Sequence, residues 1–381
     1  MKWLTGSKIS EARKWIRRLG DEAKRERASE EILKLGEESA PALIESLQTK
    51  DGDMLQIYKH LLVQLGSAAT PALTESLRGD HPAIRARVAE ILGEIKDPLT
   101  LPVLLEALEG EFYTVRSRAA IALGNIGAKQ VVQSIVAALA DPEAEVRIAA
   151  VTALGRFNDP STFDNMADLL LEDSQIEVRQ AAAKALGSTQ HPRALHYLMV
   201  ALDDPFWWYE RENEANILLD AIHNMGTQAL DSLLKALASS EGTVRRFAAI
   251  LLGRIPDQRA IEPLNMALYD THFEVGRAAA ASLAGFGPVG LKRLADAIHH
   301  PESWLRQHAI YGLTLSGDKR IVPLILDMTS DPERDVQKQA IQSLGELGDT
   351  RALPTLDAIA LNRADKEMYT LAKEAIEALK S

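Results

Sequence analysis

The amino-acid sequence predicts an all-α fold, a right-handed α-solenoid of about twelve helix pairs with roughly thirty residues in each pair. Two observations support this prediction. Hydrophobic residues make up 46% of the 381 residues, but aromatic residues only 5%. Ala and Leu must therefore fill the core, which suits closely packed helices better than a sheet. In addition, one ten-residue block recurs along the chain at nearly constant spacing.

The recurring block reads V-R-x-x-A-A-x-A-L-G. Its clearest copies are residues 115–124, 146–155, 178–187 and 244–253. Degenerate copies end at Gly36, Gly66, Gly93, Gly226, Ala284, Thr314 and Gly345. Apolar residues at offsets 0, 4, 7 and 8 line one face of a helix, so the block is interpreted as the second helix of each unit. Its last glycine is expected to end that helix in a left-handed conformation.

A first helix is predicted before each block, for example at residues 101–108, 261–268 and 321–326. Several carry a proline in the opening turn, where the missing N–H costs nothing. A short turn of Asp-Pro or His-Pro character joins the two helices. These turns begin at His81, Asp141, Asp204, His300 and Asp331. One unit is thus helix, turn, helix and loop.

We expect a single solenoid over residues 1–381, because no linker separates the repeats. A lone helix pair cannot bury its apolar face, so stacked pairs share one core and terminal pairs need polar outer faces. The amino-terminal capping pair is expected within residues 1–36 and the carboxy-terminal one within residues 350–381. One spacing of 39 residues marks an insertion in the seventh unit, near residues 204–216.

At this point the residues resemble a known family, the HEAT repeats, and in particular the short type first described in phycobilisome bilin lyases. In that family an Asp in the inter-helix turn and an Arg in the second helix form a ladder between repeats. The resemblance maps the ladder onto Asp141 with Arg147 and Asp173 with Arg179. It implies the same structural role for Arg85, Arg116, Arg245 and Arg306. Gly276 and Gln337 occupy the arginine position in two units, where the ladder should be interrupted.

Composition argues against most enzyme chemistry. The chain has no cysteine, which excludes disulfides, thiol nucleophiles and zinc–thiolate sites. Deoxyhypusine hydroxylases, a related group, bind iron through His-Glu pairs, and this chain has no His-Glu dipeptide. One concentration of histidines, His272, His299, His300 and His308, is interpreted as surface residues rather than a metal site. No metal, cofactor or catalytic residue is therefore predicted, and a non-enzyme is favoured.

The charge pattern bears on partners and location. The formal net charge is -11, which disfavours nucleic acid and anionic membranes. Residues 1–28 differ, since nine basic and four acidic residues give +5 there. With Trp3, Leu4 and Trp15, that segment is either a weak membrane or nucleic-acid contact or the polar end of a capping repeat. No segment resembles a signal peptide or membrane span, so a cytoplasmic location is the default expectation.

Aromatic residues gather at the turns. The insertion contains Phe206, Trp207, Trp208 and Tyr209. Successive helical side chains are about 100° apart, so these four cannot all face inward. They either plug a packing defect or form a binding hot spot. Phe112, Tyr113, Phe273 and Trp304 lie at equivalent turns of other units, which predicts an aromatic ridge for docking a protein partner.

A second predicted surface is the concave groove lined by the second helices. Its expected residues are Lys59, Lys184, Arg246, Arg277, Tyr311 and Lys338. A mildly positive, partly apolar groove would suit an acidic or amphipathic segment. Alternatively, these positions merely favour long solvated side chains. The favoured function is a protein-binding scaffold or adaptor. The resemblance leaves two alternatives, a bilin-lyase-like factor that handles a tetrapyrrole and, less favoured, a DNA-binding HEAT-like protein.

Overall fold

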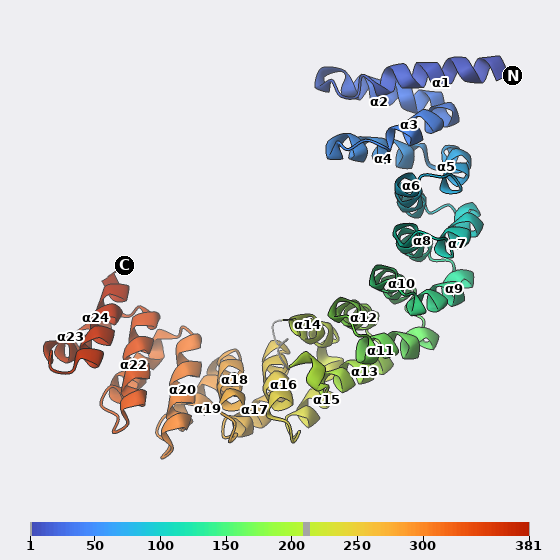
Figure 1. Ribbon diagram of the computed structural model, residues 1–381. Coiled ribbons are helices and arrows are strands. Elements are labelled where there is room, and N and C mark those ends of the chain that lie inside the picture. Colours follow the sequence, from blue (N-terminus) through green and yellow to red (C-terminus); the bar gives the residue numbers. More distant parts are fainter. Residues whose placement is uncertain (1, 209–213, 381) are drawn as a thin grey trace. The chain divides into compact units, whose positions relative to one another are not determined.

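The computed structural model describes residues 2–208 and 214–380, with side chains from Lys8 onward. Every regular element in these residues is a helix, so the predicted all-α solenoid is confirmed. The chain divides into two compact units, Met1–Ala201 and Leu202–Ser381. In each unit, first helices form one row and second helices form the other (Figure 1).

The first unit holds the helices α1 to α13, with the last residue of α13 assigned to the second unit. Contacts run between successive second helices, as in α6 with α8 and α8 with α10, so neighbouring repeats share one core. The bounds are α1 Lys2–Ile16, α2 Glu22–Leu35, α3 Ala40–Ser46, α4 Gly52–Leu65, α5 Thr70–Leu77, α6 Pro82–Ile95, α7 Leu101–Leu108, α8 Tyr113–Ile126, α9 Val132–Ala137, α10 Ala144–Phe157, α11 Phe163–Glu172, α12 Ile176–Thr189 and α13 Pro192–Leu202.

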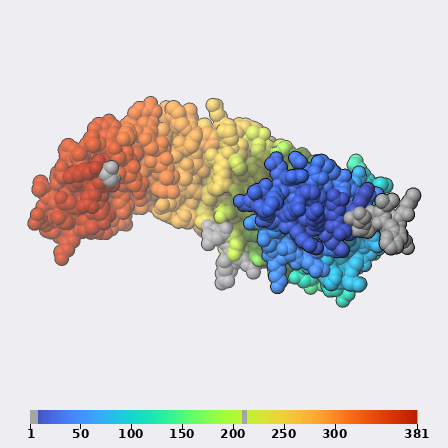
Figure 2. Space-filling view, turned by 90° about the horizontal axis from the view of Figure 1, so that it is seen from above, coloured from blue at the N-terminus to red at the C-terminus, as the bar shows by residue number. Residues whose placement is uncertain are grey.

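The second unit continues the same alternation. Its repeats from α18 to α24 form a continuous packed surface in the space-filling view (Figure 2). The bounds are α14 Asn216–Asn224, α15 Leu230–Ala236, α16 Gly242–Arg254, α17 Ile261–Ala267, α18 Phe273–Ala284, α19 Gly287–Ala297, α20 Ser303–Leu315, α21 Val322–Met328, α22 Arg334–Leu347, α23 Leu353–Leu361 and α24 Lys366–Lys380. Odd and even helices thus make twelve pairs in the described residues, as the sequence predicts.

The glycine that closes the repeated block has two different roles. Gly36 and Gly66 directly follow their helices with φ of 60° and 57°, as predicted. In most later units the prediction is wrong, because the helix continues through the glycine and ends before a residue three positions further on. Those left-handed end residues are Lys96, Gly127, Asn158, Gln190 and Gly348.

Close helix packing explains the glycines inside the helices. A Cβ on Gly93 would lie 2.6 Å from the Ala122 Cα, and one on Gly124 would lie 2.6 Å from the Ala153 Cβ. The same block position meets the next second helix at Gly155, Gly253 and Gly345. A methyl group there would force neighbouring repeats apart, so glycine sets the spacing of the second-helix row.

The arginine–aspartate ladder is present, but its pairing differs from the one expected. Arg147 donates two hydrogen bonds, of 2.7 and 3.0 Å, to the Asp173 carboxylate in the next unit. Its Nη1 donates to the backbone carbonyls of Asp141 and Pro142 in its own turn. The predicted pairing within one unit is therefore wrong, because the guanidinium spans the gap to the following repeat. Carboxylate rungs of this kind include Arg116–Asp141, Arg147–Asp173, Arg245–Asp270 and Arg306–Asp331.

Gly276 and Gln337 interrupt the ladder at their positions, as predicted. Gln337 keeps only the contact to its own turn, with Nε2 donating to the Asp331 carbonyl at 2.6 Å. Gly276 leaves a space that the His308 ring fills, since a Cβ on Gly276 would lie 2.7 Å from the His308 Cδ2. Packing of an imidazole thus replaces the charge pair between the ninth and tenth units.

Candidate interaction site

The insertion of the seventh unit begins with a short 3₁₀ turn, Pro205–Trp207, that buries one aromatic ring. The Asp204 carboxylate caps this turn by accepting from the Phe206 N–H at 2.9 Å. Trp207 is fully buried, so it serves packing, which is one of the two roles considered for this segment. Tyr209 lies outside the described residues, and Phe206 and Trp208 are partly exposed.

Trp208 is held rigidly at the surface. Its indole N–H donates to the Leu202 carbonyl at 3.0 Å. Its ring stacks on Phe247 of α16 with centroids 4.3 Å apart. The Arg246 guanidinium covers the same Phe247 ring at 4.5 Å, a cation–π contact. The sequence could not predict this stack, because Phe247 looks like an ordinary core residue of its block.

A cavity of about 280 Å³ separates Trp208 from the aromatic residue of the ninth unit, Phe273. Phe273 begins α18 and is 43% exposed. Two aromatic side chains and a guanidinium are therefore part of the cavity lining. Its lining is Trp208, Gly242, Thr243, Arg246, His272, Phe273, Glu274 and Val275.

His308 extends this aromatic surface toward the tenth unit. Its ring lies 4.6 Å from Phe273 and 5.6 Å from Trp304, measured between centroids. It is 1% exposed, so the interpretation of this histidine as a surface residue is wrong. Burial, with a smaller contribution from Arg277, lowers the pKa of His308 to about 4. Its Nε2 is buried without a hydrogen-bond partner.

The structure brings together only part of the predicted aromatic ridge. Trp208, Phe273 and Trp304 follow one another in the second unit through the cavity and His308. We call these three residues and His308 the aromatic edge. Phe112 and Tyr113 lie in the first unit and are 37% and 44% exposed.

The predicted groove cations are unequal. Lys59 is buried and paired with Glu90 at 2.5 Å, and Lys338 lies 2.7 Å from Glu367. These two charges are already neutralised within the chain. Arg277 lies over the Tyr311 ring at 4.0 Å, and Lys184 is exposed. Lys184 belongs to the first unit, and Arg246 and Arg277 belong to the second.

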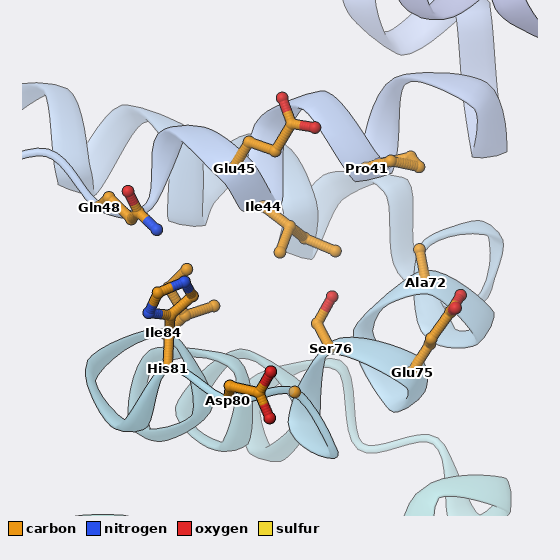
Figure 3. Close-up of a pocket in the computed structure, with 11 residues that line it drawn as sticks. Pro41, Ile44, Glu45, Gln48, Ala72, Glu75, Ser76, Asp80, His81 and Ile84 are labelled. Carbon is orange, nitrogen blue, oxygen red and sulfur yellow. The ribbon is translucent and has the colours of Figure 1, made fainter.

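A hollow in the first unit was not predicted. It measures about 450 Å³ and lies between α3, α5 and the turn before α6. Ile44 points from α3 toward Ser76 of α5, with His81 beside Ile84 (Figure 3). Its lining mixes small and polar residues with Ile44 and Ile84, a combination that forms no recognisable sequence motif. Among the described residues, no three His, Asp or Glu side chains are placed to hold a metal, and no helix is long and apolar enough to cross a membrane.

Several solved structures are similar to this chain. The complex of CpcE and CpcF of phycocyanin lyase from Nostoc is 25% identical, over 39% of this chain and 97% of that chain, with a TM-score of 0.37. Human deoxyhypusine hydroxylase is 19% identical over 74% and 97%, with a TM-score of 0.30. Kap121p bound to the SUMO protease Ulp1p is 13% identical over 97% and 53%, with a TM-score of 0.49. At these TM-scores, none indicates an activity for this chain.

No curated protein matches this chain. The family model of HEAT repeats matches residues 70–144, 132–218, 230–297 and 291–380, which together make up most of the sequence. The same residues carry the helix pairs and the ladder described above. The chain therefore belongs to the HEAT-repeat family.

Proposed function

We propose that this HEAT-repeat protein is a non-enzymatic scaffold that binds a segment of a protein partner at its aromatic edge. The observation that carries the proposal is the cavity between Trp208 and Phe273, with Arg246 in its wall. Tryptophan, tyrosine and arginine dominate the energetics of protein interfaces, because they combine large apolar area with a polar group.

The fixed position of Trp208 supports binding as well as packing. Its indole N–H is bonded to a backbone carbonyl and its ring is stacked on Phe247, so the side chain loses little freedom when a partner arrives. Preorganisation of this kind lowers the entropic cost of association. Phe273, which also lines the cavity, is 43% exposed and available for contact.

The dimensions favour a peptide side chain over a chromophore. A cavity of about 280 Å³ lies just below the range of about 300–1,000 Å³ that holds small-molecule ligands. It can accept one or two side chains. A cavity of this size with aromatic side chains in its lining favours a partner segment that carries an apolar side chain.

A displayed library of random peptides, selected on the purified protein, tests the proposal. We expect the enriched sequences to share an aromatic or aliphatic residue. Their affinity, measured by calorimetry, should fall at least about tenfold in Phe273→Ala and in Arg246→Gln. The matched control is Phe112→Ala, which removes an equally exposed ring in the first unit and should leave affinity unchanged. Peptides that bind all four proteins equally would refute the aromatic edge as the site.

A further inference from the structure

Arg85 is a ladder arginine without its aspartate. It occupies the same position in α6 as Arg116 does in α8 and Arg147 in α10, four residues after the residue that caps each helix. Its Nε is buried and has no hydrogen-bond partner. Among the described residues, the Arg85 side chain forms no hydrogen bond or ion pair, whereas the rung arginines Arg116, Arg147, Arg245 and Arg306 each bind a carboxylate through Nε and Nη2.

Glycine stands where the aspartate should be. Each rung aspartate lies 25 or 26 residues after its arginine, and the residue 25 positions after Arg85 is Gly110. A Cβ built on Gly110 would lie 3.4 Å from the Arg85 Nη2. The guanidinium therefore faces the point from which an aspartate side chain would extend. Gly110 itself supplies no carboxylate to the Arg85 guanidinium.

The rest of the rung is intact. Arg116 Nη1 donates to the carbonyls of Gly110 and Glu111 at 3.0 and 2.8 Å, as Arg147 does in its own turn. In the complete rungs, the aspartate also accepts from the N–H two residues later, as Asp141 does from Glu143 at 2.9 Å. The equivalent donor beside Gly110 is the Phe112 N–H. The turn thus retains the backbone donor but not the acceptor.

Another position shows what a complete loss of the rung looks like. Between the ninth and tenth units, Gly276 replaces the arginine and His300 replaces the aspartate, so neither half is left with a charge to satisfy. The His308 ring occupies the space. At Arg85 only the acidic half is absent, and a partly buried guanidinium is costly unless an anion compensates it.

We propose that Arg85 and the Phe112 N–H form a binding site for a carboxylate supplied from outside the chain. A carboxylate matches a guanidinium in a bidentate geometry, and the four complete rungs show that geometry in the same fold. The source would be an acidic side chain of a partner or a small organic acid. Glu109 and Glu111, exposed on either side of Gly110, are the carboxylates of this chain that could compete.

The Arg85 Nε–H resonance, observed by ¹H–¹⁵N NMR and assigned with Arg85→Gln, gives a direct test. Sodium acetate should shift it in a saturable manner, while sodium chloride at equal ionic strength should not. The Arg116 resonance, already paired with Asp141, is the internal control and should not move. A capped peptide with one Glu, compared with its Gln counterpart, separates a side-chain source from a free acid.

Gly110→Asp provides the second arm. It restores the missing carboxylate, so the Arg85 resonance should no longer respond to acetate and the melting temperature should rise by a few degrees. Glu109→Gln and Glu111→Gln should retain or strengthen the acetate response. The proposal is overturned if acetate leaves the wild-type Arg85 resonance unmoved, or if the response persists unchanged in Gly110→Asp.

Discussion

Two parts of this solenoid solve the same problem with different chemistry. Between α8 and α12 in the first unit, each arginine reaches across to the aspartate of the next turn, and the pairs are 5% to 14% exposed. Between α18 and α20 in the second unit, Gly276 occupies the position of the ladder arginine. The His308 ring fills the space that the arginine side chain would take, and Phe273 and Trp304 contact that ring. Neighbouring repeats stack in both places.

The comparison distinguishes two ways of holding neighbouring repeats together, a directional charge pair and aromatic packing. A charge pair fixes the register of two repeats through directional hydrogen bonds, but its desolvation offsets much of its stabilising effect. Aromatic packing stabilises through buried area and does not require a matched ion. It also leaves Phe273 43% exposed, at the surface where we propose that a partner binds.

Restoring the ladder residue at the aromatic junction should have the largest effect. Gly276→Arg would place a Cβ 2.7 Å from the His308 Cδ2 and 2.9 Å from the Leu268 carbonyl. It would also add a cation with no aspartate opposite, since His300 holds that position. We expect the free energy of unfolding in urea to fall by about 4 kcal/mol.

Two comparison variants sharpen that result. Gly52→Arg adds the same side chain where no atom lies within 4 Å of the new Cβ, and should change stability by no more than about 0.5 kcal/mol. Combining Gly276→Arg with His300→Asp and His308→Ala converts the junction into a rung and should recover much of the loss. If Gly276→Arg alone is as stable as the wild type, the close packing of His308 against Gly276 is contradicted.

Acid should weaken the two parts in different pH ranges. Burial lowers the pKa of His308 from 6.5 to about 4, so the neutral ring stabilises the fold above pH 6.5 and that contribution is lost as the pH falls toward 4. For Asp173, burial acts to raise the pKa, but the hydrogen bonds from Arg147 and the Gln175 N–H, together with the nearby guanidinium charges, outweigh it and hold the pKa below 3.8. The contribution of Asp173 is therefore lost only below that value. At pH 4.5 the histidine alone should cost about 2.5 kcal/mol.

The measurement is the free energy of unfolding at pH 7.0, 5.5 and 4.5 for the wild type and His308→Gln. The variant should be less stable at pH 7.0 but lose about 2.5 kcal/mol less on acidification. Other titrating groups act on both proteins and cancel in the difference. Parallel pH profiles would show that His308 titrates normally in the folded state.

The repeat could be predicted almost completely from the sequence, because its period, apolar offsets and turn residues are local signals. Helices α7 and α8 lie where the pattern places them. The role of the block glycine could not be predicted in this way. Gly66 and Gly93 look alike in the sequence, but Gly66 follows its helix and Gly93 lies inside one against Ala122. That difference depends on the neighbouring repeat.

The candidate site was predictable only in part. Consecutive aromatic residues marked the insertion, yet only contacts with other repeats show that Trp207 is buried and that Trp208 stacks on Phe247. The sequence pattern identifies Arg85 as a ladder residue. It does not show that Arg85 lacks a partner, because the partner position is known only from the rungs in the structure and is occupied here by Gly110. Absences of this kind become visible only when the partner position is known.

The smallest expected effect compares two phenylalanines with similar exposure at equivalent turns. Phe273 is 43% exposed and Phe112 37%, but only Phe273 contacts the His308 ring, at 4.6 Å. Phe273→Ala should lower the free energy of unfolding by about 1 kcal/mol, the usual value of an aromatic pair. Phe112→Ala should change it by less than about 0.5 kcal/mol. Equal losses in urea titrations would mean that the aromatic edge adds nothing to the stability of its junction, and that Phe273 is kept for binding alone.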